Sequence, residues 1–355
     1  MAHALLSPSA ASRWMTCPPS ARLETKFENT TSVYAEEGLL AHSLADALCK
    51  YSVGTLIGED FATVLGQIGH SQYYNSEMHG YIDAYSQYVA ECFATAKART
   101  GDAVIETEVK FDLRKYIPDS FGTSDVVIIG DGIMQVIDLK YGQGVPVDAE
   151  NNKQMMIYAL GALEKYDFLY DIHTVNMTIY QPRLDNISTW DLPVEDLREW
   201  AETELKVKAA LAYDGAGDYK AGGHCRFCRA KAICRARAEE NLRLAQYEFK
   251  QGPLLSDEEI GDILKVSENL KNWAENVAAY ALEQAISGTQ YEGWKLVEGR
   301  SNRIISDETA AVETLEALYP PEKIYNKKLK GIGDLEKLMG KKAFNASLGS
   351  LIIKP

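Results

Sequence analysis

The sequence predicts an α/β fold in which helices flank a mixed β-sheet. The first observation is a succession of alternating or β-branched runs, typical of strands, at 103–111, 121–130 and 133–140. The second is a helical pattern followed by a fourth such run, over 150–165 and 173–181. Three strands, a helix and another strand describe a mixed sheet with helices on its faces. Further predicted elements are a strand near 186–191 and helices over about 34–51, 77–99 and 193–213.

Length and composition are those of a globular protein. The chain has 355 residues, of which 46% are hydrophobic and 25% charged, which is enough for one large domain or two ordinary ones. No apolar run approaches the roughly 20 residues that cross a bilayer, and no secretory signal is visible. We therefore expect a cytoplasmic protein without a membrane partner.

The net charge of −14 argues against a protein that coats nucleic acid non-specifically. It does not exclude a nuclease, because a catalytic metal site needs carboxylates and a DNA groove needs only local basic residues.

A polar stretch around Pro253 marks a predicted domain boundary. The first domain would span 1–250, and a C-terminal accessory module would span 251–355. In the module we expect a helix over about 256–287, a small hairpin over 291–306 and short helices to the end. This helical or α+β extension has a role that the sequence leaves open.

The most informative local feature is a predicted hairpin whose turn is the Asp-Gly dipeptide at 131–132, a pair that favours two-residue turns. A tight turn pairs Gly130 with Ile133, and counting outward brings Asp125 opposite Asp138. Carboxylates paired in this way lie about 4.5–5.5 Å apart at Cβ and repel each other. A divalent cation between them would offset that repulsion.

Strand alternation places Lys140 on the same face as Asp138, with Leu139 on the other face. Met134 and Val136 share the face of Asp138, so that two carboxylates and an ammonium lie on an otherwise apolar hairpin. This pattern favours a site for phosphodiester cleavage. The alternative is an exposed hairpin edge whose charges face water, which explains the apolar neighbours less well.

Other polar residues are candidates for the same site. His42, four residues after a glycine, could ligate a metal or a phosphate. Gln154 and Tyr158 are four residues apart and therefore lie on one face of the predicted helix. Glu106 and Glu108 alternate onto one face of the first strand, where we favour an exposed strand face over an approach to the metal.

Four of the six cysteines indicate a metal or cluster site. Cys225, Cys228 and Cys234 follow a C-x2-C-x5-C spacing, and Cys17 could supply a fourth thiolate from the far end of the domain. Disulfides are rare in the cytosol, and four thiolates suit a [4Fe–4S] cluster or a structural zinc. We favour the cluster, because zinc ribbons usually bring two close pairs of cysteines. Such a ligand set would staple the ends of the domain together.

The ordered motifs resemble the RecB/AddB-type branch of the PD-(D/E)XK nuclease superfamily, particularly its members with an iron–sulfur cluster. The matching motifs are Cys17-Pro18, Gly38-x3-His42, Gly122-x2-Asp125, Asp138-Leu139-Lys140, Gln154-x3-Tyr158 and Cys225-x2-Cys228-x5-Cys234. The match covers about residues 7–240, and six motifs in the family's order make it specific. The amino-acid sequence around 121–141 and 154–162 is also similar to that of an uncharacterised family of phage and prophage proteins. This similarity implies a bacterial host cell.

This resemblance implies a restriction-endonuclease-like sheet stapled by an Fe–S cluster, and a role for each matching residue. The catalytic residues would be Asp125, Asp138, Lys140, Gln154 and Tyr158. The ligands of Mg²⁺ or Mn²⁺ would be His42, Asp125, Asp138 and the Leu139 carbonyl. The ligands of the cluster would be Cys17, Cys225, Cys228 and Cys234. Lys140 would orient the attacking water or stabilise the developing oxyanion, and Gln154 and Tyr158 would position the scissile strand.

The function expected is that of a metal-dependent deoxyribonuclease, an exonuclease acting on DNA ends or single strands. Its partners would be DNA and the proteins of phage recombination, replication or DNA processing. The alternative is a catalytically silent DNA-binding or assembly subunit, which the acidic charge favours and the intact set of acidic and lysine residues disfavours. A zinc-stabilised structural protein is a third interpretation.

Overall fold

The computed structural model describes residues 4–28, 33–243, 256–298, 305–326 and 328–352. The chain divides into two compact units, Met1–Thr289 and Gln290–Pro355. The domain boundary predicted at residue 250 falls within 244–255, which lies outside the described residues.

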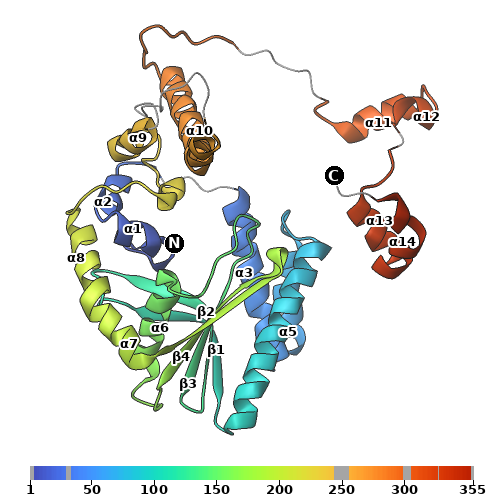
Figure 1. Ribbon diagram of the computed structural model, residues 1–355. Helices are drawn as coiled ribbons and strands as arrows, with labels where there is room; N and C mark the ends of the chain where they lie inside the picture. The colour runs from blue at the N-terminus through green and yellow to red at the C-terminus, as the bar shows by residue number, and fades with distance from the viewer. Residues whose placement is uncertain (1–3, 29–32, 244–255, 299–304, 327, 353–355) are drawn as a thin grey trace. The chain divides into compact units, whose positions relative to one another are not determined.

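A five-stranded mixed sheet forms the centre of the first unit (Figure 1). The strands lie side by side in chain order: β1 (Val104–Asp112), β2 (Phe121–Gly130), β3 (Ile133–Leu139), β4 (Thr174–Gln181) and β5 (Asn186–Pro193). Strands β3 and β4 are parallel, and the other neighbouring pairs are antiparallel. The parallel pair follows from its connection, since helix α6 (Lys153–Tyr166) crosses between the two strands. The predicted α/β sheet flanked by helices is therefore confirmed.

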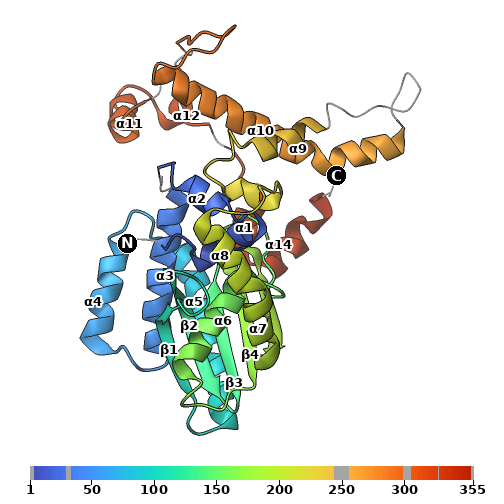
Figure 2. The ribbon, with the colours of Figure 1, turned by 90° about the vertical axis from the view of Figure 1, so that its left-hand side faces the viewer.

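Helices cover both faces of the sheet (Figures 1 and 2). One face packs against α6 and against helices that precede or follow the sheet in the chain. Those that precede it are η1 (Pro8–Ala10), α1 (Ala11–Thr16) and α2 (Ser20–Glu24), and those that follow it are α7 (Val194–Trp200), the π-helical turn η3 (Ala201–Leu205) and α8 (Lys206–Asp214). The other face packs against α3 (Val33–Ser52) and α5 (Ser76–Arg99), with α4 (Gly58–Gly69) adding partly buried side chains. Burial on both faces explains why β3 is almost wholly apolar.

Helix α6 is fixed at its start and along its length. The Asn152 side chain accepts hydrogen bonds from the backbone N–H groups of Gln154 and Met155, which caps the first turn. A Cβ at Gly161 would lie 2.7 Å from Phe111, so this glycine allows α6 to approach β1 closely. The cap and the close packing hold Gln154 in the turn of α6 that faces the carboxyl end of β3.

The remaining regular elements of the described chain are helices. In the first unit it comprises η2 (Pro182–Leu184), η4 (Gly223–Phe227), α9 (Arg235–Leu242) and α10 (Asp257–Ile286). The second unit comprises α11 (Glu308–Glu316), α12 (Pro321–Ile324), α13 (Ile332–Met339), α14 (Lys341–Leu348) and η6 (Gly349–Leu351). The hairpin predicted over 291–306 is wrong for 291–298, where no strand forms, and 299–304 lie outside the described residues. Among the helices described here, none combines the length and the apolar character that a bilayer span requires.

Candidate functional site

The β2–β3 hairpin has the turn and the register predicted from its Asp-Gly dipeptide. Asp131 and Gly132 have φ values of 54° and 70°, the left-handed conformation that a two-residue hairpin turn requires. Pairing runs from Gly130 with Ile133 to Val126 with Ile137. The next residues outward are therefore Asp125 on β2 and Asp138 on β3.

Asp125 connects strand β3 to helix α3. Its Oδ1 lies 2.9 Å from Nδ1 of His42, and its Oδ2 accepts a hydrogen bond of 2.7 Å from the backbone N–H of Leu139. Helix α3 carries His42 to this point because its buried residues, among them Leu44 and Leu48, pack on the sheet.

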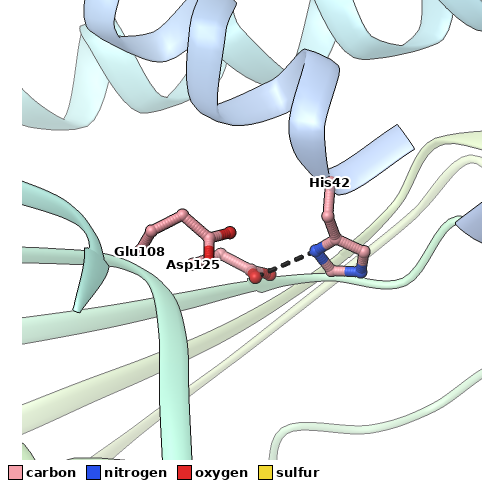
Figure 3. A group of neighbouring side chains, drawn as sticks. All are labelled: His42, Glu108 and Asp125. Carbon is pink, nitrogen blue, oxygen red and sulfur yellow. Dashed lines mark hydrogen bonds and ion pairs between the residues drawn. The ribbon is translucent and has the colours of Figure 1, made fainter. Parts of the chain in front are cut away.

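Glu108 on β1 completes a group with His42 and Asp125, as Figure 3 shows. One potential ligand atom from each side chain lies within 4.8 Å of the others. Glu108 was not predicted as a ligand, because alternation placed Glu106 and Glu108 together on one strand face, and an exposed face was favoured over an approach to the metal. That prediction is wrong: Glu106 pairs with Lys165 of α6 on the opposite face, at 3.1 Å.

The reason is a break in the alternation of β1. Glu108 has a φ of 51°, in the left-handed region that non-glycine residues rarely adopt. Before it, Thr107 donates a hydrogen bond to Asp46 of α3. After it, Val109 packs in the core that contains α6, although Thr107 and Val109 have the same parity. No sequence signal marks this inversion, since the local residues alternate as an ordinary strand would.

The other predicted site residues form a hydrogen-bonded network around Asp138. Lys140 Nζ lies 2.9 Å from Asp138 Oδ2 and donates to Gln154 Oε1 at 2.8 Å. Gln154 Nε2 donates to Asp138 Oδ1 at 3.2 Å and to the hydroxyl of Tyr158 at 3.1 Å. The four-residue spacing of Gln154 and Tyr158 therefore brings both side chains to one place, next to the carboxylate and the ammonium of β3.

The electrostatics reflect crowding of carboxylates. Burial lowers the pKa of His42, but the charge and the hydrogen bond of Asp125 outweigh it and raise the pKa to about 9. Partial burial of the carboxyl, and then the charges of Asp125 and Asp46, raise the pKa of Glu108 to about 7. Burial raises the pKa of Asp138 above its usual range. The positive charge of Lys140 lowers this pKa, and the negative charge of Asp125 raises it, but burial has the largest effect.

The donor set fits a divalent cation. Carboxylate oxygens and an imidazole nitrogen are suitable ligands for Mg²⁺ or Mn²⁺. Asp138 is only 3% exposed, yet among the described residues its Oδ2 accepts no hydrogen bond of good geometry. A buried carboxylate oxygen left in this way is costly unless another group compensates it. The Lys140 ammonium, 2.9 Å from this oxygen, compensates its charge, and a divalent cation would add to that compensation.

The four predicted cluster cysteines also lie together. Cys17, Cys225, Cys228 and Cys234 line one small cavity, whose other lining residues include Arg13, Lys220, His224, Lys231 and Arg237. The backbone N–H of Lys220 lies 3.4 Å from the Cys17 sulfur. Burial, and then the charge of Glu24, raises the pKa of Cys228 to about 11. Among the described side chains that can bind metals, only the group of His42 brings three ligand atoms within 4.8 Å. The four thiols thus line one cavity, but their sulfur atoms do not form a group as close as that of His42, Glu108 and Asp125.

Fold and site together define an α/β protein whose mixed sheet carries a polar centre suited to a divalent cation. The chain belongs to the family described as "Protein of unknown function (DUF2800)", whose model matches residues 3–355.

Two solved structures show distant likeness. The protein SSO0001 is 15% identical over 63% of this chain and 84% of its own, with a TM-score of 0.27. A protein of Eubacterium rectale named "Putative exonuclease" is 11% identical over 70% of this chain and 90% of its own, with a TM-score of 0.33. At these TM-scores neither likeness establishes a shared fold or a shared activity.

Proposed function

We propose that this protein is a deoxyribonuclease of the RecB/AddB-type branch of the PD-(D/E)XK superfamily, dependent on Mg²⁺ or Mn²⁺. Its substrate is DNA with free ends or single strands, which it degrades as an exonuclease in phage recombination, replication or DNA processing. The observation that carries the proposal is the meeting of Asp125, Asp138 and Lys140 at the carboxyl end of β3, with His42 beside them.

The cation ligands in this proposal are His42, Asp125, Asp138 and the Leu139 carbonyl. Support comes from the contact of Asp125 with His42 and from the burial of the Asp138 carboxylate beside Lys140. When bound, a divalent cation supplies a Lewis acid that activates water and neutralises charge on the phosphoryl group.

The protein's own groups then act on the phosphate and on water. The Lys140 ammonium orients the attacking water or stabilises negative charge on the phosphoryl oxygens as the P–O bond to the leaving strand breaks. Gln154 holds Lys140 by accepting its hydrogen bond at 2.8 Å. Gln154 and Tyr158 also present an amide and a hydroxyl with which to position the scissile strand. A network already assembled without substrate lowers the cost of ordering the site.

For the cysteines we propose a [4Fe–4S] cluster, with zinc as the alternative. The cavity shared by Cys17, Cys225, Cys228 and Cys234 supports this assignment, as do the cationic residues that line it. Positive side chains offset the negative charge of four thiolates, and a backbone N–H near the Cys17 sulfur is the kind of hydrogen bond that tunes such clusters.

The test uses the purified full-length chain with Mg²⁺ or Mn²⁺ and end-labelled single-stranded and duplex DNA. We expect cleavage that EDTA abolishes, with products shortened from an end. Asp138→Asn and Lys140→Met should each lower the rate at least about 100-fold. DNA binding without turnover in either metal would overturn the proposal and favour a catalytically silent binding subunit. Undiminished cleavage in Asp138→Asn would also overturn it.

A further inference from the structure

Three buried polar atoms at the cysteine cavity have no hydrogen-bond partner among the described residues. They are Nε of Arg13 on α1, Oγ of Ser20 at the start of α2 and Nε of Arg237 on α9. All three residues line the same cavity as the four cysteines. Buried polar groups in folded proteins are hydrogen-bonded almost without exception. Three exceptions around one small cavity therefore point to a bound group that carries acceptor atoms.

Arg13 and Ser20 belong to the helices on either side of Cys17. Nη2 of Arg13 forms an ion pair with Glu24 at 2.8 Å, and its Nη1 donates to the carbonyl of Phe227 at 3.3 Å. These contacts fix the guanidinium and leave Nε as the donor without a partner. Ser20 is only 3% exposed, and its backbone N–H donates to the carbonyl of Cys17 at 2.9 Å. Its hydroxyl is thus held next to the first predicted cysteine ligand.

Arg237 brings a positive charge from the other end of the domain. It lies three residues after Cys234 and is only 3% exposed. Its Nη1 donates to the backbone carbonyl of Lys231 at 2.9 Å, but it forms no ion pair with a described acidic side chain, and no Asp or Glu is among the described residues that line the cavity. A buried guanidinium stays charged and is unfavourable unless an anion pairs with it. Arg237 therefore requires a negatively charged partner within the cavity.

We infer that Arg13, Ser20 and Arg237 donate hydrogen bonds to the sulfur atoms of an iron–sulfur cluster, and that Arg237 is its buried counter-ion. This inference rests on the cluster that the proposed function assigns to the cysteines, and it adds three residues that bind no iron. A [4Fe–4S] cluster with four thiolates is an anion, and its sulfides and thiolates accept hydrogen bonds. Donors and positive charge favour the reduced form of a cluster, since reduction adds negative charge. The three residues thus raise its reduction potential.

The experiment measures this potential in the full-length chain, purified without oxygen, by titration with dithionite as the electron donor. Visible absorbance follows the reduction. Arg237→Gln removes the charge and should weaken the reduction equilibrium at least about tenfold, which is about 59 mV for one electron. Arg237→Lys keeps the charge and should recover most of that loss. Arg235→Gln is the matched control, because this arginine of the same helix is exposed and lies outside the cavity. It should leave the potential unchanged.

Ser20→Ala tests the hydrogen bonds by a smaller change and decides the question if Arg237→Gln does not fold. The substitution removes a buried hydroxyl that lacks a partner in the protein. We therefore expect no decrease in the melting temperature of the cluster-free chain. In the cluster-loaded chain the same substitution should lower the reduction potential. A residue with a purely structural role would instead change the melting temperature and leave the potential as it was.

An unchanged potential in Ser20→Ala, or in a folded Arg237→Gln, would overturn the inference and leave the cluster in place. An equal decrease in Arg235→Gln would also overturn it, because the effect would then be that of any nearby charge. A chain that binds zinc in place of iron would overturn the inference and the cluster assignment together. Cleavage of labelled DNA by the same preparations tests the proposed nuclease activity separately, so that the two failures are distinguishable.

Discussion

His42 on α3 and Asp125 on β2 meet at 2.9 Å although they are 83 positions apart in the chain. The contact joins the helical layer directly to the hairpin of the sheet. It also brings an imidazole that favours protonation next to carboxylates that repel one another. In the absence of a cation, protons on His42 and Glu108 neutralise the negative charge of the site. A bound metal ion would neutralise the same charge.

Cation affinity should therefore increase with pH. His42 must lose its proton to bind a cation, and its pKa is about 9. Glu108 must lose its proton too, and its pKa is about 7. Both groups are protonated at pH 6, whereas at pH 8 only His42 remains so. We expect the Kd for Mn²⁺ to fall by about tenfold or more per pH unit between pH 6 and 8, as one or more protons leave per ion. Calorimetric titration at several pH values measures this.

The same titration in buffers of different ionisation enthalpy counts the released protons. His42→Asn should reduce the count at pH 8, and Glu108→Gln should reduce it at pH 6. A Kd that stays constant over this range would contradict the proposed ligands.

The metal-free protein should show the opposite dependence on pH. A folded-state pKa that is raised, as for His42 and Glu108, means that the folded chain binds more protons than the unfolded one. The stabilising contribution is complete below the ordinary pKa of each group and is lost as pH rises through the raised value. In EDTA, the melting temperature should thus decrease between about pH 5 and pH 9. The slope should be smaller in Glu108→Gln, and an unchanged slope in that variant would contradict this account.

Asp138→Asn should separate activity from stability. Asp138 is buried, and burial raises its pKa, so the charged form is held in an unfavourable place. An amide of the same shape removes that charge and keeps an oxygen for Gln154. We expect a melting temperature equal to or above that of the wild type in EDTA, together with the loss of cleavage. A strongly destabilised variant would mean that Lys140 and Asp138 form a structural ion pair, not a catalytic one.

The sequence was sufficient for the features that depend on local chemistry. The Asp-Gly turn determined the register of β2 and β3, and the spacing of Gln154 and Tyr158 placed both on the face of α6 that meets β3. It was insufficient where the backbone departs from its regular period. The inversion at Glu108 depends on tertiary contacts, because its residue type does not favour a positive φ. Helix α4 was not predicted, since its glycines read as a connection.

The cysteine cavity should contain iron. Protein purified without oxygen should be brown, absorb near 400 nm and contain about four iron and four sulfide ions per chain. Cys17→Ser should lose the colour and lower the melting temperature, because it releases the N-terminal helices from the segment that carries Cys225 and Cys228. Cys92→Ser is the matched control, since this cysteine lies outside the cavity. A colourless protein that contains about one zinc ion per chain would show that the cysteines bind zinc instead of an iron–sulfur cluster.

Gly132→Ala should destabilise the hairpin on which the site depends. Gly132 has a φ of 70°, and a Cβ there would lie 2.7 Å from the ring of His173. We expect a loss of about 1–2 kcal/mol in the free energy of unfolding by urea, from the strained φ and the displaced ring. Gly66→Ala, in the exposed middle of α4 where a Cβ meets nothing within 4 Å, should instead add about 0.5–1 kcal/mol. In the double variant Gly132→Ala with His173→Ala, the loss of unfolding free energy that comes from the displaced ring should be recovered. The loss that comes from the strained φ should remain. If Gly132→Ala alone matched the wild type in stability, the left-handed turn between β2 and β3 would be wrong, and the pairing that brings Asp125 beside β3 would lose its basis.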